Sequence, residues 1–206
     1  MGLHKVNDQT LVAVRENYEK IKNTHPNMRA RDIAKELHIS EAELLASRIG
    51  KEIIKLEGDW AELIRSMPNL GSVMALTRND SCVHEKHGEY DNISIGPGHG
   101  LVLNHDIDLR LFMSHWHFGF AVSEIVASGK RYSFQFFDIN GEAVHKVYMP
   151  KGNNLRAYKA IVNKFRSANQ TEEISIHKLP SRKKDISDDN LDIENFISHW
   201  TNLKDT

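Results

Sequence analysis

The sequence predicts an α+β fold in which N-terminal helices pack on a large, mainly antiparallel β-sheet, with a C-terminal helix after a polar linker. Apolar residues near the N-terminus recur at three- and four-residue spacing, which is typical of amphipathic helices. Between about residues 52 and 150, apolar and polar residues alternate in short runs, as they do in strands. The turns between these runs are too short for parallel crossovers, so neighbouring strands are expected to be antiparallel.

The helical cap is expected to end at about residue 50. One apolar stripe is formed by Leu11, Val14, Tyr18 and Ile21, and the segment around Pro26 then breaks the helix. A second helix is expected over residues 28–38. Ser40 follows as an N-cap, and Glu43 completes a capping box for a third helix. Together these segments predict a helix-turn-helix.

We expect one domain over residues 1–168, followed by a linker and a further helix. Within that domain we expect a sheet region over about 52–150, with a hairpin turn at Asp138–Gly141, and an amphipathic helix over 154–166. Residues 169–190 are polar and lack periodicity, which predicts a linker. Residues 191–206 regain helical spacing and predict the start of a helix leading toward a second half absent from this chain. The apolar positions of that helix are Ile193, Phe196, Ile197 and Trp200.

Composition excludes several function classes. The 206 residues include 27 basic and 28 acidic side chains, a balance that argues against a general nucleic-acid binder. The single cysteine, Cys82, excludes an internal disulfide and a cysteine-based zinc site. No apolar run approaches the roughly 18 residues of a membrane span, and the N-terminus lacks a signal peptide. We therefore expect a cytoplasmic protein without membrane insertion.

The helix-turn-helix raises an alternative, a DNA-binding regulator. Its second helix would begin with Glu41 and Glu43, whose carboxylates suit the positive end of the helix dipole but would repel phosphate. A helical cap packed on a sheet is the better interpretation.

Residues 107–113 predict a strand with two different faces. Ile107, Leu109, Leu111 and Met113 would lie on the buried face, and Asp108, Arg110, Phe112 and Ser114 on the other. Arg110 and Phe112 could offer a guanidinium and an aromatic ring to one planar ligand. From the pattern alone, an outward Arg110 paired with a cross-strand acid, with Phe112 in a second small core, remains an alternative.

Twelve histidines are present, and seven of them fall between residues 84 and 145. His84 lies on a predicted strand, where its imidazole could bind iron or simply face solvent. His115 and His117 share one strand parity and could chelate a metal, although such a pair more often ends a strand. The loop at Gly96–Gly100 is too short for a phosphate loop. No carboxylate pair or Ser/His/Asp constellation is visible.

Two longer phrases, GLVLNHDIDLRLF at residues 100–112 and QFFDINGEAVHKVY at 135–148, resemble the HemS/ChuS haem-utilisation family. Members of that family are tandem duplications of a half built on a large antiparallel sheet, and this chain resembles their N-terminal half. The resemblance implies a haem-binding protein of bacterial haem-iron acquisition that carries haem or degrades it. Degradation would require an external reductant, and the protein would exchange haem with an uptake transporter or a downstream acceptor.

The resemblance also assigns residues. It implies that Arg110 faces the haem iron on the distal side with Phe112 beside it, and that His84 belongs to an alternative haem site. The family's proximal histidine would fall just beyond Thr206. Shorter ChuX-type relatives compensate by pairing, so a homodimer is an open expectation. A structural half that stays inert without its partner half is the remaining alternative.

Overall fold

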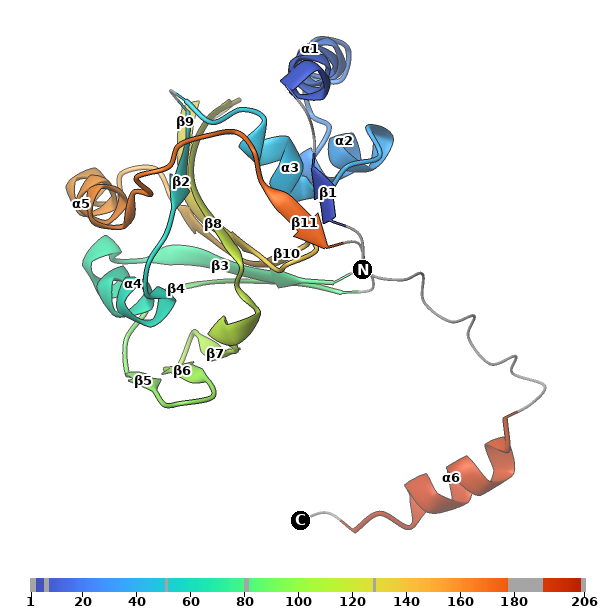
Figure 1. Ribbon diagram of the computed structural model, residues 1–206. Coiled ribbons are helices and arrows are strands. Elements are labelled where there is room, and N and C mark those ends of the chain that lie inside the picture. Colours follow the sequence, from blue (N-terminus) through green and yellow to red (C-terminus); the bar gives the residue numbers. More distant parts are fainter. Residues whose placement is uncertain are drawn as a thin grey trace.

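A curved, six-stranded antiparallel sheet forms the centre of the molecule in the computed structural model, which describes residues 3–5, 8–50, 52–79, 82–127, 129–177 and 191–204 (Figure 1). The strand order is β2-β8-β9-β10-β3-β4. Neighbouring strands are antiparallel throughout, as the short turns predict. The strands are β2 (Ile53–Leu56), β3 (Val73–Arg78), β4 (Val83–Gly88), β8 (Phe118–Val126), β9 (Gly129–Phe137) and β10 (Ala143–Met149).

A second, three-stranded sheet is formed by β5 (Ile93–Ile95), β6 (Gly100–Leu103) and β7 (Asp108–Leu111). These strands alternate as predicted, but they do not join the large sheet. They are inserted between β4 and β8 and lie below it in Figure 1. Alternation identifies a strand without identifying its partner, which explains why a single sheet region was expected.

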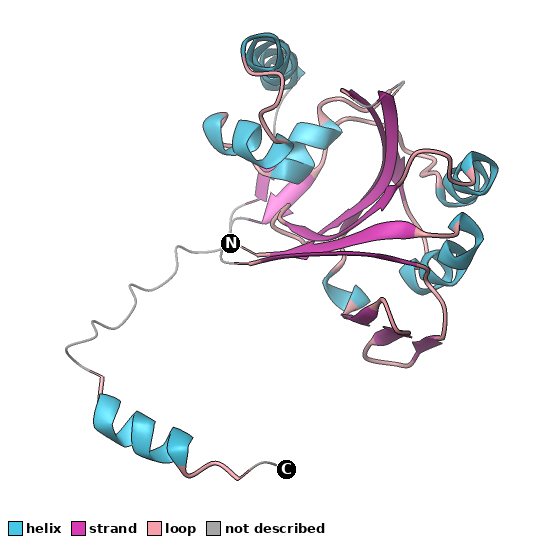
Figure 2. Cartoon of the chain, turned by 180° about the vertical axis from the view of Figure 1, so that it is seen from behind, coloured by secondary structure: helices cyan, strands magenta, loops and turns pink. Residues whose placement is uncertain are grey.

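Helices cover both faces of the large sheet (Figure 2). On one face, α4 (Trp60–Ser66), the 3-10 turn at Met67–Leu70 and α5 (Leu155–Phe165) enclose the main core together with the three-stranded sheet. On the other face, α3 (Glu41–Ala46) packs on β2, β8 and β9. The helices α1 (Asp8–Thr24) and α2 (Ala30–Glu36) pack against α3. The α+β architecture predicted from the sequence is confirmed.

Local signals in the sequence account for several element ends. Ser40 caps α3, and its side chain accepts from the Glu43 amide while the Glu43 carboxylate accepts from the Ser40 amide, so the predicted capping box is present. Asp59 caps α4 by accepting from two backbone amides. The β9–β10 turn places Gly141 at φ 79°, a left-handed conformation that favours glycine.

The predicted linker contains a strand that the sequence did not indicate. Within it, β11 (Ser175–His177) pairs antiparallel with β1 (Leu3–Lys5), which itself falls inside the predicted helical cap. Three residues are too few to give a periodic signal. Residues 178–190 lie outside the described part of the chain.

The last helix is α6 (Ile193–Thr201), within the range that helical spacing predicts. Every described side chain from Leu191 to Lys204 is exposed, including those of Phe196 and Trp200, whose ring centroids lie 6.0 Å apart. None of the helices that the structure describes is long and apolar enough to cross a membrane.

The burial of α3 shows that the DNA-binding interpretation is wrong for this helix. All six of its residues are buried, so it cannot enter a DNA groove. Glu41, at its first position, forms an ion pair with Lys146 of β10, and the two side chains are only 5% and 7% exposed. The acidic start of this helix therefore faces a cation inside the protein.

We expect Lys146→Met to lower the free energy of unfolding by about 3–5 kcal/mol, because it leaves the Glu41 carboxylate buried without its counter-charge. The matched control is Lys164→Met, which breaks an ion pair with Glu62 whose partners are 53% and 52% exposed. That change should cost less than about 1 kcal/mol. Urea unfolding of both variants measures the difference, and equal losses would contradict the assignment.

Candidate functional site

The three-stranded sheet has one buried face and one open face. Val102, Leu109 and Leu111 point into the main core, and all three are buried. The register pairs Leu101 with Arg110 and Leu103 with Asp108, so these four side chains share the opposite side. We call this side the outer face and define it by Ser94, Leu101, Leu103, Asp108, Arg110 and Phe112, together with His99 in the β5–β6 turn.

Arg110 and Phe112 lie on the outer face, as the alternation predicts. Phe112 is 53% exposed, although a large aromatic side chain would ordinarily be covered. Arg110 donates to the Asp108 carboxylate at 2.9 Å, and both side chains are exposed. The strand ends at Leu111, and a 3-10 turn follows at Met113–His115. Although the strand has ended, Met113 still packs against the main core and Ser114 is exposed, so both lie on the predicted sides.

The outer face combines apolar surface with positive charge. Phe112 and Leu103 are exposed and Leu101 is partly exposed. Arg110, which carries the positive charge, is the cross-strand partner of Leu101. Such a surface can bind a flat, mainly apolar molecule that carries carboxylates, because the guanidinium can donate two parallel hydrogen bonds to one carboxylate. The exposed Arg110–Asp108 pair stabilises little, since solvent screens it, so a ligand can replace it at low cost.

Both connections between the two sheets converge on one residue, His145 of β10. Tyr90, between β4 and β5, has its hydroxyl 2.6 Å from Nε2 of His145. Trp116, between β7 and β8, stacks over His145 with ring centroids 5.6 Å apart and over Phe136 at 4.3 Å. His145 and Phe136 are cross-strand partners. These contacts fix the position of the three-stranded sheet on the large one.

Burial determines the charge states of His145 and Tyr90, which together anchor the three-stranded sheet. Burial lowers the pKa of His145 to about 4, with a weaker opposing effect from the Leu76 backbone. The same burial raises the pKa of the Tyr90 hydroxyl above its usual value. Both groups are therefore neutral near pH 7, and a neutral hydrogen bond suits an apolar core. The sequence showed His145 as one of several clustered histidines and gave no sign that it was buried.

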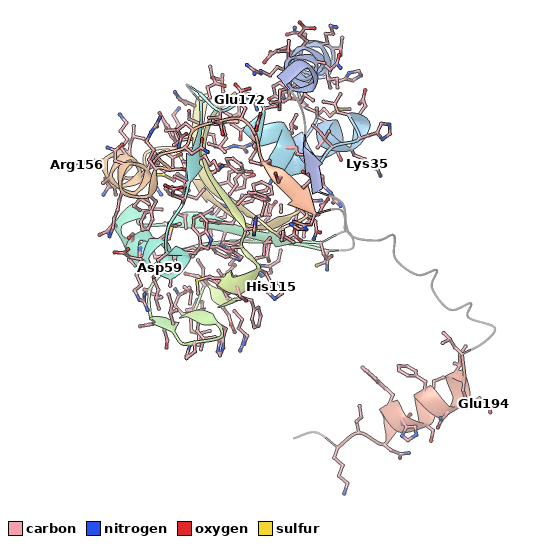
Figure 3. The ribbon with its side chains drawn as sticks, viewed as in Figure 1. Lys35, Asp59, His115, Arg156, Glu172 and Glu194 are labelled. Atoms are coloured by element: carbon pink, nitrogen blue, oxygen red, sulfur yellow. The ribbon has the colours of Figure 1, made fainter. Side chains whose placement is uncertain are left out.

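The other predicted histidines do not gather around Arg110. His84 is exposed on β4, an edge strand of the large sheet, whereas Arg110 and Phe112 lie on the small one. His115 and His117 are exposed on either side of the buried Trp116, and Figure 3 labels His115 where the chain leaves the small sheet. Within the described ranges, no group of three or more histidine, cysteine or acidic residues could hold a metal ion.

One outer-face residue was not singled out from the sequence. His99 lies in the turn between β5 and β6, and its ring centroid is 6.2 Å from that of Phe112. The alternation of strand side chains could have indicated it, because His99 lies two residues before Leu101, the cross-strand partner of Arg110, and so has the same parity.

The geometry thus defines the class of protein. It is an α+β domain in which a small inserted sheet exposes a face with a cationic and an aromatic side chain. A family model described as the haemin-degrading HemS.ChuX domain matches residues 38–165. The chain belongs to this family. The matched range contains both sheets, apart from the short β1–β11 pair, and every residue of the outer face.

Similar proteins include the hemin transport protein HmuS of Yersinia pestis, which is 40% identical over 151 residues, or 73% of this chain and 44% of that protein. Among solved structures, the heme-binding protein PhuS of Pseudomonas aeruginosa in its holo form is 37% identical with a TM-score of 0.81. The match covers 95% of this chain and 57% of PhuS. The heme degrading enzyme ChuS of Escherichia coli O157:H7 is 29% identical, with a TM-score of 0.76 and coverage of 95% and 56%. This chain therefore spans about half the length of these proteins.

Protonation of His145 should make stability depend on pH. Its pKa is lower in the folded state than the ordinary value of 6.5, so its contribution is complete above pH 6.5 and is lost as the pH falls toward 4. We expect the stability advantage of the wild type over His145→Gln to shrink by about 2 kcal/mol between pH 7 and pH 5. Urea unfolding at both pH values measures it. An advantage that stays constant would show that His145 titrates normally in the folded protein.

Proposed function

We propose that this chain binds haem on the outer face of the three-stranded sheet, as part of bacterial haem-iron utilisation. The observation that carries the proposal is the exposed Phe112 beside Arg110 on a face whose reverse side is fully packed. Membership of the HemS.ChuX family supports it, as do similar proteins named for hemin transport, heme binding and heme degradation.

Haem fits the chemistry of this face. Its macrocycle is flat and apolar, which suits Phe112, Leu101 and Leu103, and its carboxylates suit a nearby guanidinium. Covering these side chains would remove apolar surface from water, at about 25 cal/mol per Å² of area buried. When bound, haem supplies iron, whose redox chemistry belongs to the cofactor. Arg110 supplies positive charge, and Phe112 supplies a stacking surface.

The open geometry suits exchange of haem between proteins. The outer face lies at the surface, so an incoming partner could reach the bound haem directly. We infer that the partners are a haem-uptake transporter on the donor side and a downstream haem acceptor. A second copy of the chain, or the additional length that the similar proteins possess, would supply a second wall over the haem.

His84 would serve a separate contact. It is exposed on β4, an edge strand of the large sheet, whereas the outer face belongs to the three-stranded sheet. We propose that it belongs to an alternative haem contact, as the family resemblance implies, rather than to the Arg110 site.

Haemin titration followed by Soret absorbance tests the assignment of residues. Arg110→Ala should weaken binding about tenfold or more, because a charge-assisted hydrogen bond contributes about 1.5–3 kcal/mol. Phe112→Ala should weaken it about fivefold through lost stacking. His84→Ala should leave the main transition nearly unchanged.

Two surface variants control for nonspecific effects. Arg156→Ala removes an exposed arginine on α5, away from the small sheet in Figure 3. Ile125→Ala removes a side chain that is 79% exposed on β8. Both should bind like the wild type. A wild type without saturable binding would instead support the inert-half alternative, and equal weakening by controls and site variants would disprove the assigned face.

Degradation should be inefficient in this chain alone. Haem on an open face stays in contact with water, whereas an enzyme site that consumes haem must exclude competing reactions. Incubation of the haem complex in air with ascorbate should therefore leave most of the Soret band intact and release little carbon monoxide. Stoichiometric carbon monoxide release would show that this chain is itself an enzyme.

A further inference from the structure

We propose that a groove on the helical-cap side of the large sheet binds a small organic molecule that carries two or more anionic groups. This site goes beyond the proposed function and does not depend on haem. The groove has a volume of about 1160 Å³ and opens to solvent. Small-molecule pockets typically measure about 300–1,000 Å³, so the groove has room for an organic ligand and not only for an inorganic ion.

The groove lies between α2 and the neighbouring ends of β3 and β10. Lys35 and His38 line it from α2 and the turn that follows, and Figure 3 labels Lys35 away from the small sheet. Arg78 lines it from the end of β3, on the same strand face as Leu76. The cross-strand partner of Leu76 is Lys146, which pairs with α3, so this is the face on which α3 packs. The three-stranded sheet packs on the opposite face, and the groove is therefore separate from the outer face.

Most of the acids that line the groove are already engaged. Glu41 forms the ion pair with Lys146, and the Asp138 carboxylate accepts from the backbone amides of residues 140 and 142. Arg31 and Glu142, one charge of each sign, also have partners. These carboxylates therefore do not neutralise the remaining cations of the groove.

The remaining cations are available to a ligand. In the described part of the chain, neither the Lys35 ammonium nor the Arg78 guanidinium has a hydrogen-bonding or ion-pairing partner, and of the described acids in the lining only Asp32 is likewise unpaired. Two cations on different elements can contact two anionic groups of one molecule, and such charge-assisted hydrogen bonds are roughly twice as strong as neutral ones. Ile39 and Val144 line the same groove and can cover an apolar part of the ligand.

The backbone of His38 is a second, independent indication. His38 is exposed, and its φ is 55°, in the left-handed region that favours glycine. It follows the end of α2, where the amides of His38 and Ile39 donate to the Lys35 and Ala34 carbonyls at 3.2 and 3.0 Å. Helices commonly end with glycine at this position, so the histidine keeps a strain that glycine would relieve. Its imidazole lines the groove, where it can donate to an anion, and a ligand contact explains why the strain is kept.

Isothermal titration calorimetry of the full chain without haem tests the site. ADP and citrate are the probes, because one carries phosphates and the other carboxylates, and uncharged adenosine is the matched control. We expect at least one of the two anions to bind saturably, and adenosine to bind much more weakly. Binding of ADP alone would identify a phosphate ligand, binding of citrate alone a carboxylate ligand, and binding of both a site that accepts either group.

Variants assign the binding to the groove. Lys35→Ala and Arg78→Ala should each weaken anion binding about tenfold or more, because each removes charge-assisted hydrogen bonds. Arg156→Ala removes an exposed arginine on α5 and should bind like the wild type. His38→Gly should unfold at a higher urea concentration, because the strain is relieved, and yet bind the anion more weakly. A purely structural role of His38 would change the unfolding and leave the binding unchanged.

Saturation by neither anion, or equal weakening by Arg156→Ala, would overturn the inference. Adenosine that binds as tightly as ADP would also overturn it, because the cations would then contribute nothing. Saturating haemin should leave the anion affinity unchanged, and displacement of the anion by haemin would contradict a separate site. Anion binding without haemin binding would leave this site standing while the proposed function fails, and haemin binding without anion binding would do the reverse.

Discussion

The contacts of His145 are the constraint on which the candidate site depends. The chain leaves the large sheet after β4 and returns to it at β8, and the two crossings bring Tyr90 and Trp116 onto the same imidazole. Trp60 of α4 fastens the second crossing by donating its indole N–H to the Trp116 carbonyl at 3.0 Å. Burial keeps His145 neutral, so the anchor needs no counter-charge.

This anchor allows the three-stranded sheet to expose an apolar face. A small sheet without a packed side is marginally stable in water. Here Val102, Leu109 and Leu111 bury one side in the main core, so the other side is free to present Phe112 and Arg110 to a ligand. The rigid large sheet thus positions a surface that is itself only three short strands wide. A binding surface built on strands keeps its side chains in fixed register.

The sequence predicts the parts of the site that follow from local periodicity. Alternation through IDLRLF correctly placed Arg110 and Phe112 opposite Leu109 and Leu111, because the side-chain period of a strand is two. The capping box at Ser40 and the turn before Gly141 were also predicted, since both depend on nearby residues.

Features that depend on distant partners could not be predicted in the same way. The separate three-stranded sheet depends on pairings that alternation does not specify. The burial of His145 depends on Tyr90, 55 residues earlier in the chain. The Glu41–Lys146 ion pair joins two residues that are 105 positions apart in the sequence. Because of such distant contacts, α3 is buried, although its local sequence pattern resembles that of a DNA-recognition helix.

Nuclear magnetic resonance of the isotope-labelled chain with added haemin tests most directly whether haem lies against the outer face. Paramagnetic iron broadens the signals of nearby amides. If haem binds there, broadening begins at residues 99–103 and 108–112, while the amides of α5 remain sharp. Broadening centred on β4 or α6, with residues 108–112 unaffected, would contradict it.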